Sequence, residues 1–416
     1  MSSTVLSIMP DLKIPEFLTR EIGAKLAYVD DTIFDAKVSA DLGGIVLHLT
    51  EEPSKAKREY LIEKTNLVVS SLVKGAFEPN LRVVVDKTDR EFSYCEDPMN
   101  TLTERREVVI EGHGYYVLGP IMSGLLEYFE EKYHAVAVEM GARPYRFPAL
   151  ISPAYLEKVK YFSNFPHSLS FVTHLREDLD VIREFSEDAR TDNGRIKAKN
   201  DAFADIQAML SPTVCHHLYM SLADSIVPAD GVIATATGNC FRYESSNMAS
   251  LERLWNFTMR EIIFVGTEDF VKDGLDRAQE RMNAILDEMD LAYRIETAND
   301  PFFIGSYRDQ AAYQSAFELK LEVRLPLPYS GDTLAVASYN RHRDFFGRTL
   351  DIQMPDGSYS ETGCVGFGCE RLAFAFVAQH GPDSANWPQA VREHVEDGAA
   401  RWHSPSSPSF DGPPNF

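Results

Sequence analysis

Arg242, Glu244 and Glu261 are the first residues of the chain whose types and spacing suggest binding chemistry. The flanking runs Val232–Ala236 and Arg260–Val265 have the composition of strands, and the polar segment between them predicts a long antiparallel hairpin. An arginine and a carboxylate on one hairpin suit a ligand with an anionic end and a cationic or donor end. A surface ion pair is the simpler interpretation, because most neighbouring Arg–Glu pairs are of that kind. The hairpin by itself favours this simpler interpretation.

A second stretch, Thr362–His380, changes that balance. It contains Gly363, Gly366 and Gly368, followed by Arg371 and an apolar helical run. Glycines allow a ligand to approach the backbone closely, and the start of a helix favours bound anions. The glycine spacing does not match a P-loop or a dinucleotide-binding fingerprint, so both are excluded.

Length and composition limit the possible classes of protein. A chain of 416 residues predicts two units, or one large domain with an appendage. The formal net charge of −22 argues against a broad nucleic-acid surface. No apolar run reaches membrane-spanning length, and Met1–Pro10 lacks the features of a signal peptide. Five cysteines in so long a chain do not form a disulfide framework, so a cytoplasmic location is expected.

Residues 1–111 are predicted to form an accessory domain without assigned chemistry. Ile45–Leu49 and Leu81–Val85 have the pattern of strands, and Ser54–Val73 has the pattern of a helix. The stretch shows no sustained heptads, and its charge is mixed rather than basic. Its composition therefore gives no direct sign of a nucleic-acid-binding arm.

The rest of the chain predicts an α+β fold built on an antiparallel sheet. Gly119–Pro120 begins a helix with apolar residues at steps of three and four, which ends before Gly141. Glu177–Ala202 predicts a solvated helix and a loop around Thr191–Gly194, and Glu268–Leu291 predicts a long helix. Phe317–Leu325 alternates apolar and charged residues, which is typical of a strand with one buried face.

Together these segments resemble the catalytic core of class II aminoacyl-tRNA synthetases, most closely the seryl-tRNA synthetases. The helix and RFPAL at about 120–148 resemble motif 1, FRYE within 232–265 resembles motif 2, and GFGCER within 362–380 resembles motif 3. The motifs occur in the family's order. The resemblance implies a catalytic domain at 112–400, with the Ser- and Pro-rich segment 401–416 as a disordered tail.

The resemblance implies an ATP site and a set of roles. Arg242 would hold the α-phosphate, and Glu244 would lie beside the nucleotide. Arg253 would reach the outer phosphates, Phe257 would stack under adenine, and Arg371 would cover its other face near the γ-phosphate. Arg242 and Arg371 would be the catalytic residues, because adenylation depends on positioning the reactants and neutralising the developing charge.

Two metals are implied by the resemblance. ATP implies Mg²⁺, but the family's metal-holding glutamate falls near Leu334–Ala335, where this chain has no carboxylate. Cys215, Glu261 and Cys364 match the zinc ligands of the atypical, zinc-containing seryl enzymes and of the tRNA-independent amino acid–[carrier protein] ligases. Two thiolates and a carboxylate suit Zn²⁺, and an open fourth position could take the amino group of a substrate. Such a site would select a small amino acid: glycine, alanine or serine.

Alternatives remain for the ligands and for the acceptor. His216 or His217 could replace one zinc ligand, whereas Cys240 and Cys369 are expected to be packing residues. The aminoacyl group is expected to pass to the phosphopantetheine thiol of a carrier protein rather than to tRNA. A seryl-type synthetase and a non-catalytic amino-acid sensor are the alternative functions, and the motif 1 helix implies a homodimer.

Overall fold

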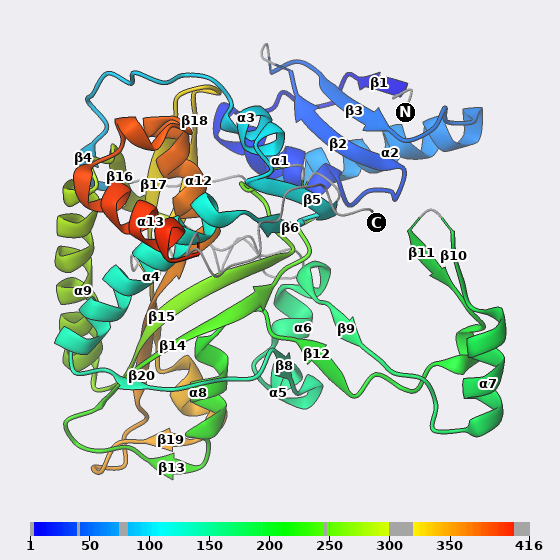
Figure 1. Ribbon diagram of the computed structural model, residues 1–416. Coiled ribbons are helices and arrows are strands. Elements are labelled where there is room, and N and C mark those ends of the chain that lie inside the picture. Colours follow the sequence, from blue (N-terminus) through cyan, green and yellow to red (C-terminus); the bar gives the residue numbers. More distant parts are fainter. Residues whose placement is uncertain are drawn as a thin grey trace.

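An eight-stranded sheet organises the molecule (Figure 1). The computed structural model describes residues 4–39, 42–74, 82–192, 194–244, 248, 250–298 and 319–402, so the predicted disordered tail lies outside the described residues from 403 onward. The strand order is β4-β16-β17-β18-β20-β15-β14-β7. All neighbouring pairs are antiparallel except β7 and β14. The strands are β4 (Val83–Lys87), β7 (Arg143–Pro144), β14 (Val232–Phe241), β15 (Asn256–Gly266), β16 (Tyr293–Thr297), β17 (Lys320–Leu327), β18 (Asp332–Arg343) and β20 (Glu361–Gly368).

Helices pack on both faces of this sheet, which confirms the predicted α+β class. One face carries α4 (Pro120–Glu139), α9 (Glu268–Glu288), α12 (Cys369–His380) and α13 (Gln389–Trp402). The other face carries α5 (Pro153–Lys158), α6 (Tyr161–Asn164), α8 (Cys215–Ser221) and α11 (Phe345–Leu350). Tyr133 of α4 stacks on Phe367 of β20 at 4.1 Å between ring centroids. On the second face, Tyr219 of α8 lies 4.4 Å from Phe346 of α11.

The predicted hairpin is present and is longer than its apolar runs suggested. β14 and β15 pair from Val232 and Val265 to Phe241 and Asn256. Polar residues such as Asn239 and Thr258 continue the ladder beyond the buried end of the hairpin. The β14–β15 loop, residues 242–255, therefore starts directly at Arg242.

The N-terminal part forms a separate small core. A three-stranded sheet, in the order β1 (Thr4–Ile8), β3 (Ile45–Leu49), β2 (Ile33–Val38), packs on α1 (Thr19–Leu26) and α2 (Lys55–Val73). The predicted helix and the first predicted strand are confirmed. Ser54 caps α2, since its hydroxyl accepts a hydrogen bond from the Lys57 amide at 3.2 Å.

The segment between this sheet and α4 joins the larger body. Leu81, in the second predicted strand, lies outside the described residues, but β4 follows it and pairs with β16 at the edge of the large sheet. Next come α3 (Pro98–Glu104) and the hairpin of β5 (Val108–Gly112) and β6 (Tyr115–Leu118). The domain boundary at residue 111 stays a prediction.

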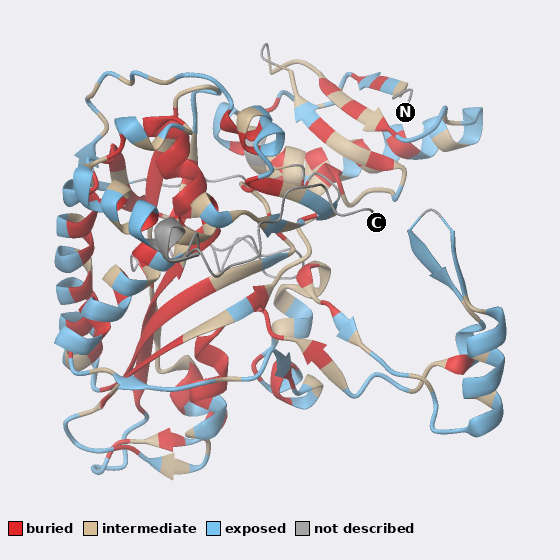
Figure 2. Cartoon of the chain, in the orientation of Figure 1, coloured by how far each residue is buried: buried red, intermediate tan, exposed pale blue. Residues whose placement is uncertain are grey.

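An arm projects from the main body (Figure 1). It contains α7 (Leu179–Asp188) and the hairpin of β10 (Arg190–Asp192) and β11 (Arg195–Lys197). Its base is a small sheet of β8 (Leu150–Ile151), β12 (Ala208–Leu210) and β9 (Phe171–Val172), while β13 (Ser225–Ile226) pairs with β19 (Ile352–Gln353) elsewhere. α7 has no buried residue, as the prediction of a solvated helix required (Figure 2). The prediction of a loop around Thr191–Gly194 missed β10 and β11. These exposed strands have three residues each, too few to show an alternation of apolar and polar residues in the sequence.

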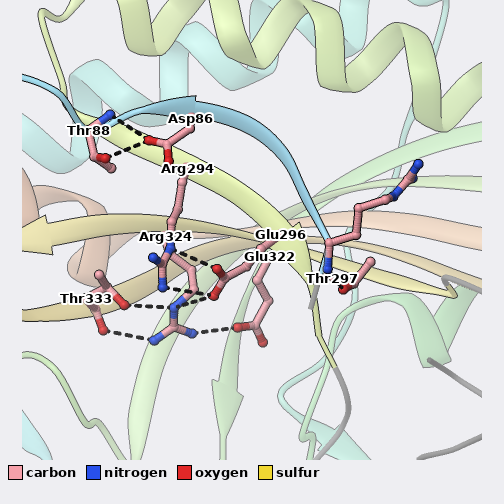
Figure 3. Close-up of polar contacts among 9 residues, drawn as sticks. Asp86, Thr88, Arg294, Glu296, Thr297, Glu322, Arg324 and Thr333 are labelled. Atoms are coloured by element: carbon pink, nitrogen blue, oxygen red, sulfur yellow. Dashed lines mark hydrogen bonds and ion pairs between the residues drawn. The ribbon is translucent and has the colours of Figure 1, made fainter. Parts of the chain in front are cut away.

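A buried ion network lies on β16 and β17 (Figure 3). Arg324 contacts Glu322 at 2.8 Å and Glu296 at 3.4 Å, and donates hydrogen bonds to the carbonyl and hydroxyl oxygens of Thr333, each at 2.9 Å. Arg294 contacts Glu296 at 2.8 Å. Arg324 and Glu296 are only 9% and 8% exposed. The predicted alternation on β17 is present from Leu319 onward, but the expectation of a single buried face was wrong. The charged face is covered, and its charges compensate one another.

We predict that Arg324→Leu lowers the free energy of unfolding by about 1.5–3 kcal/mol, because it removes a buried, hydrogen-bonded cation while Arg294 and Lys320 remain beside Glu296 and Glu322. Urea denaturation of the two proteins measures this difference. Arg277→Leu, which removes an exposed arginine from α9, should change stability by less than about 0.5 kcal/mol. Equal effects of the two substitutions would contradict the prediction.

Candidate active site

Cys215, Glu261 and Cys364 converge in the interior, as the sequence predicted. They come from the start of α8, the middle of β15 and the middle of β20. All three are buried, and each offers a ligand atom within 4.8 Å of the other two. The two sulfur atoms are 3.9 Å apart. In the part of the chain that the structure describes, this is the group of acidic, cysteine and histidine side chains with metal-ligand spacing.

The chemistry of this cluster fits a bound cation. Oε1 of Glu261 accepts hydrogen bonds from the Thr213 hydroxyl at 2.9 Å and the Val214 amide at 3.2 Å. Oε2 is buried without a hydrogen-bond partner. A buried carboxylate oxygen that lacks a partner is costly unless a positive charge faces it. Two sulfurs and this free oxygen are ligands that Zn²⁺ accepts.

Without a metal, the surroundings shift all three groups toward their protonated forms. Burial raises the pKa of Cys215 and that of Glu261. The hydrogen bond with Cys215, together with burial, raises the pKa of Cys364 well above its usual range. A metal would therefore displace protons on binding.

Thr213 and Asn340 support the cluster, and the sequence analysis did not assign either of them. Thr213 lies 3.4 Å from the Cys215 sulfur in addition to its bond with Glu261. Asn340 of β18 donates to the Cys364 sulfur at 3.7 Å and to the Ser338 hydroxyl at 3.0 Å. Groups that orient metal ligands in this way commonly tune a site. The short spacing from Thr213 to Cys215 was the one local signal available.

The two histidines next to Cys215 have structural contacts instead. The His217 ring stacks on Phe147 at 5.5 Å between centroids, and its Nε2 contacts the Ser211 hydroxyl at 3.0 Å. His216 lies edge-on to the rings of Tyr155 and Phe346. Neither histidine belongs to the cluster of possible ligands.

Cys240 and Cys369 also lie outside that cluster. Both are buried, and Cys240 packs with Val214, Ala236 and Met259.

Arg242 is connected to the cluster by two consecutive residues, Pro212 and Thr213. Its Nε donates to the Pro212 carbonyl oxygen at 2.8 Å, while the adjoining Thr213 bonds Glu261. The Arg242 guanidinium also lies over the Phe257 ring, 5.4 Å from its centroid. The segment before α8 thus holds the arginine of the hairpin beside the buried carboxylate.

Arg371, at the start of α12, forms an ion pair with Glu244 of the β14–β15 loop. Their closest nitrogen and oxygen atoms are 3.4 Å apart, and both side chains are about one-third exposed. Such a partly solvated pair is weak, so a ligand can replace it at low cost. Arg253 lies in the same β14–β15 loop, where its amide donates to the Ser250 carbonyl oxygen.

The sheet register shows which residues lie beside Glu261 on its face of the sheet. Glu261 pairs with Gly366, Gly366 with Ser338, and Ser338 with Glu322, so the four residues form a row across four strands. Directly paired residues project from the same face of a sheet. Gly366 presents no side chain beside Glu261; a Cβ there would approach the Met259 methyl carbon to 2.5 Å.

The position expected for a magnesium ligand is apolar. Leu334 pairs with Leu325 and is buried in the main core, and Ala335 follows it. Neither residue can bind Mg²⁺, so the departure seen in the sequence remains in the structure.

Solved structures first define the class of protein. The chain superposes on M. kandleri SerRS, crystallised with A. aeolicus tRNASec, with a TM-score of 0.68 at 19% identity, covering 95% of this chain and 78% of that one. A cytoplasmic serine–tRNA ligase from Naegleria fowleri with AMP gives 0.59 at 13% identity, covering 82% and 80%. The fold is therefore that of the class II aminoacyl-tRNA synthetases.

Sequence relatives define the family more closely. Amino acid–[acyl-carrier-protein] ligase 1 of Bradyrhizobium diazoefficiens is 34% identical over 313 residues, covering 73% of this chain and 93% of the relative. Ligase 2 of the same organism is 36% identical over 252 residues, covering 60% and 73%. A type-2 serine–tRNA ligase of Methanococcus aeolicus is 27% identical over 330 residues, covering 76% and 62%. No family model matches the chain. The chain belongs to the family of the amino acid–[acyl-carrier-protein] ligases, and type-2 serine–tRNA ligases are among its homologues. The predicted resemblance is confirmed.

No helix among the described residues is long and apolar enough to cross a membrane.

We predict that Glu261 gives metal-free protein a contribution to stability that declines as pH rises from about 4.5, and that Glu261→Gln removes this contribution. Because burial raises the pKa of Glu261 above its ordinary 4.5, the folded protein keeps this proton where the unfolded chain has released it. Stability from this group is full below pH 4.5 and declines until the pH passes the folded pKa, by up to about 1.4 kcal/mol per pH unit.

Urea denaturation of chelator-treated proteins between pH 4.5 and 7.5 measures this dependence. Exposed Glu187→Gln is the control and should keep the wild-type slope. A Glu261→Gln slope equal to that of wild type would contradict the prediction.

Proposed function

We propose that this enzyme activates a small amino acid with ATP and transfers the aminoacyl group to the phosphopantetheine thiol of a carrier protein. The observation that carries the proposal is the connection from Arg242 through Pro212 and Thr213 to Glu261. It places a cation suited to a phosphate next to the Cys215–Glu261–Cys364 cluster. An amino acid held at the cluster by its amine would present its carboxylate toward that arginine.

The proposed reaction has two steps. The carboxylate of the amino acid attacks the α-phosphorus of ATP, and pyrophosphate leaves. The deprotonated thiol of the carrier then attacks the carbonyl carbon, a thioester forms, and AMP leaves. Neither step requires a protein nucleophile, so positioning and charge neutralisation are the contributions of the protein.

The proposed roles follow the predicted site residues. Arg242 neutralises the α-phosphate, and Phe257 supports the adenine ring. Arg371 gives up its ion pair with Glu244 and covers the other face of the nucleotide. Arg253 extends toward the outer phosphates. Mg²⁺ would arrive bound to ATP, and Leu334 and Ala335 supply no ligand for it.

Cys215, Glu261 and Cys364 would hold Zn²⁺. The ion would supply a Lewis-acidic position for the amine of the substrate. The three protein ligands would form the floor of the amino-acid site, and all three are themselves buried. A large side chain would have little room there, which favours glycine, alanine or serine.

The names of the relatives support the carrier-protein acceptor, since two ligases of that description match 73% and 60% of this chain at 34% and 36% identity. The type-2 serine–tRNA ligases make tRNA charging the alternative, at lower identity. A homodimer through α4 also belongs to this proposal.

The test of function combines two assays. ATP–pyrophosphate exchange should occur with glycine, alanine or serine, and the activated amino acid should load a phosphopantetheinylated carrier protein but leave tRNA uncharged. Arg371→Ala should lower exchange about 100-fold or more, since it removes charge stabilisation from the transition state. Arg277→Ala, on the outer side of α9, is the matched control and should retain full exchange.

Charged tRNA without a loaded carrier would replace the proposal with an unusual synthetase. An absence of exchange with every amino acid would favour a sensor.

We predict that Cys215→Ser loses zinc and exchange activity together, because a serine hydroxyl is a poor zinc ligand near neutral pH. ATP binding should persist, since Arg242, Phe257 and Arg371 are unchanged. Elemental analysis of protein purified without chelator should give one zinc per chain for wild type and for Cys240→Ser, a control at a buried cysteine outside the cluster. Full zinc in Cys215→Ser would show that the ligand set is wrong.

A further inference from the structure

Tyr28, in the N-terminal part of the chain, contacts the β14–β15 loop. Tyr28 follows α1, and its hydroxyl donates a hydrogen bond to the carbonyl oxygen of Tyr243 at 3.3 Å. The Tyr28 ring also lies edge-on to His167, 5.3 Å between centroids. The hydrogen bond joins residues 215 positions apart in the chain. It connects a domain without assigned chemistry to the segment that carries Arg242 and Glu244.

The backbone of Tyr243 is hydrogen-bonded through both its carbonyl oxygen and its amide. Its carbonyl oxygen accepts from Tyr28, and its amide donates to the Ser168 carbonyl oxygen at 3.1 Å. Its ring lies edge-on to Trp255 at 5.0 Å, and the Trp255 indole donates to the Ser170 hydroxyl at 2.7 Å. Neither backbone bond of Tyr243 comes from the hairpin itself.

The far end of the loop is held by the β5–β6 hairpin. The Gly114 carbonyl oxygen accepts from the amides of Trp255 at 2.8 Å and Asn256 at 3.3 Å. Gly114 has a positive φ of 76°, and a Cβ there would lie 2.6 Å from the Trp255 nitrogen. Tyr116 donates its hydroxyl to the Met248 carbonyl oxygen at 3.0 Å. Segments that precede α4 therefore fix the loop at its start, within it and at its end.

The electrostatic surroundings keep Tyr28 a hydrogen-bond donor. Burial raises the pKa of Tyr28, and the neighbouring Glu244 and Tyr243 raise it further. Glu244 in turn pairs with Arg371. The hydroxyl thus stays neutral and protonated beside the charged pair.

We propose that Tyr28 is a positioning residue, through which the N-terminal domain holds the Arg242–Glu244 segment in the conformation that binds ATP. The proposal rests on the proposed function in one respect, namely that this segment contacts ATP. Ordering a loop on ligand binding costs conformational entropy, and a loop that is ordered beforehand avoids this cost. The N-terminal domain then acts on the catalytic site of its own chain.

Tyr28→Phe tests the proposal, because it removes the hydroxyl and keeps the ring against His167. One hydrogen bond of this kind corresponds to about a three- to tenfold effect. We expect ATP to bind about three- to tenfold more weakly by calorimetry, with a matching rise in KM for ATP. KM for the amino acid and zinc content should not change. Hydrogen–deuterium exchange should become faster in peptides that span residues 242–255.

Tyr60→Phe is the matched control, since Tyr60 is an exposed tyrosine on α2 of the same domain. It should leave ATP affinity and loop exchange at wild-type values. Thermal unfolding of both variants should be close to wild type, which separates a local effect from a loss of fold.

Unchanged ATP affinity together with unchanged loop exchange in Tyr28→Phe would overturn the proposal. A uniform rise in exchange across the N-terminal domain and the loop would also overturn it, because Tyr28 would then support folding in general. If wild-type protein fails to bind ATP, the proposed function fails. Faster loop exchange in the variant would still establish the contact, and its absence would still refute it.

Discussion

The burial of Glu261 is the constraint on which the site depends. Its carboxyl group is 1% exposed, one oxygen is bonded from Thr213 and Val214, and the other oxygen lacks a partner. Ionising such a group in the interior is expensive, so it must stay protonated or face a cation. The same is true of the two thiols beside it. The surrounding strands, with Gly366 opposite Glu261 and Asn340 next to Cys364, keep the donors pointing toward one another.

The network around Arg324 shows the contrasting solution on the same sheet. There, the guanidinium of Arg324 lies between the buried Glu296 and the partly buried Glu322, and the charges are compensated by the chain itself. Glu261 lies on β15, three strands from β17, and among the described residues the Cys215–Glu261–Cys364 cluster brings acidic groups together without an ion-paired cation. Because the chain compensates its own charges around Arg324, the uncompensated acidic groups of the Cys215–Glu261–Cys364 cluster are informative. The missing positive charge is what a metal ion would provide.

The sequence predicted those helices and motifs whose signals lie within a short stretch of residues. Ser54–Val73 and the Gly119–Pro120 helix have clear periodicity and caps, and both helices are present. Arg242, Phe257 and Arg371 were assigned through motifs in which spacing is short and residue types are specific. Tyr28, Thr213 and the Arg324 network were not assigned, because their partners lie far away in sequence or on neighbouring strands. An exposed-looking Glu or Arg in an alternating strand has the same sequence pattern whether water or another charge faces it.

The position of β20 has a consequence for how the molecule folds. β20 lies between β18 and β15, so it joins the β4-β16-β17-β18 half of the sheet to the β15-β14-β7 half. It is also the final strand of the large sheet in chain order. On a ribosome, both halves must wait with unpaired edges until residues 361–368 emerge, and unpaired edges promote aggregation. Pairings so distant in sequence fold slowly. The same strand carries Cys364 and leads directly to Arg371, so the cluster and the start of α12 are completed in the step that closes the sheet. A nascent chain therefore cannot assemble the candidate site before its architecture is complete.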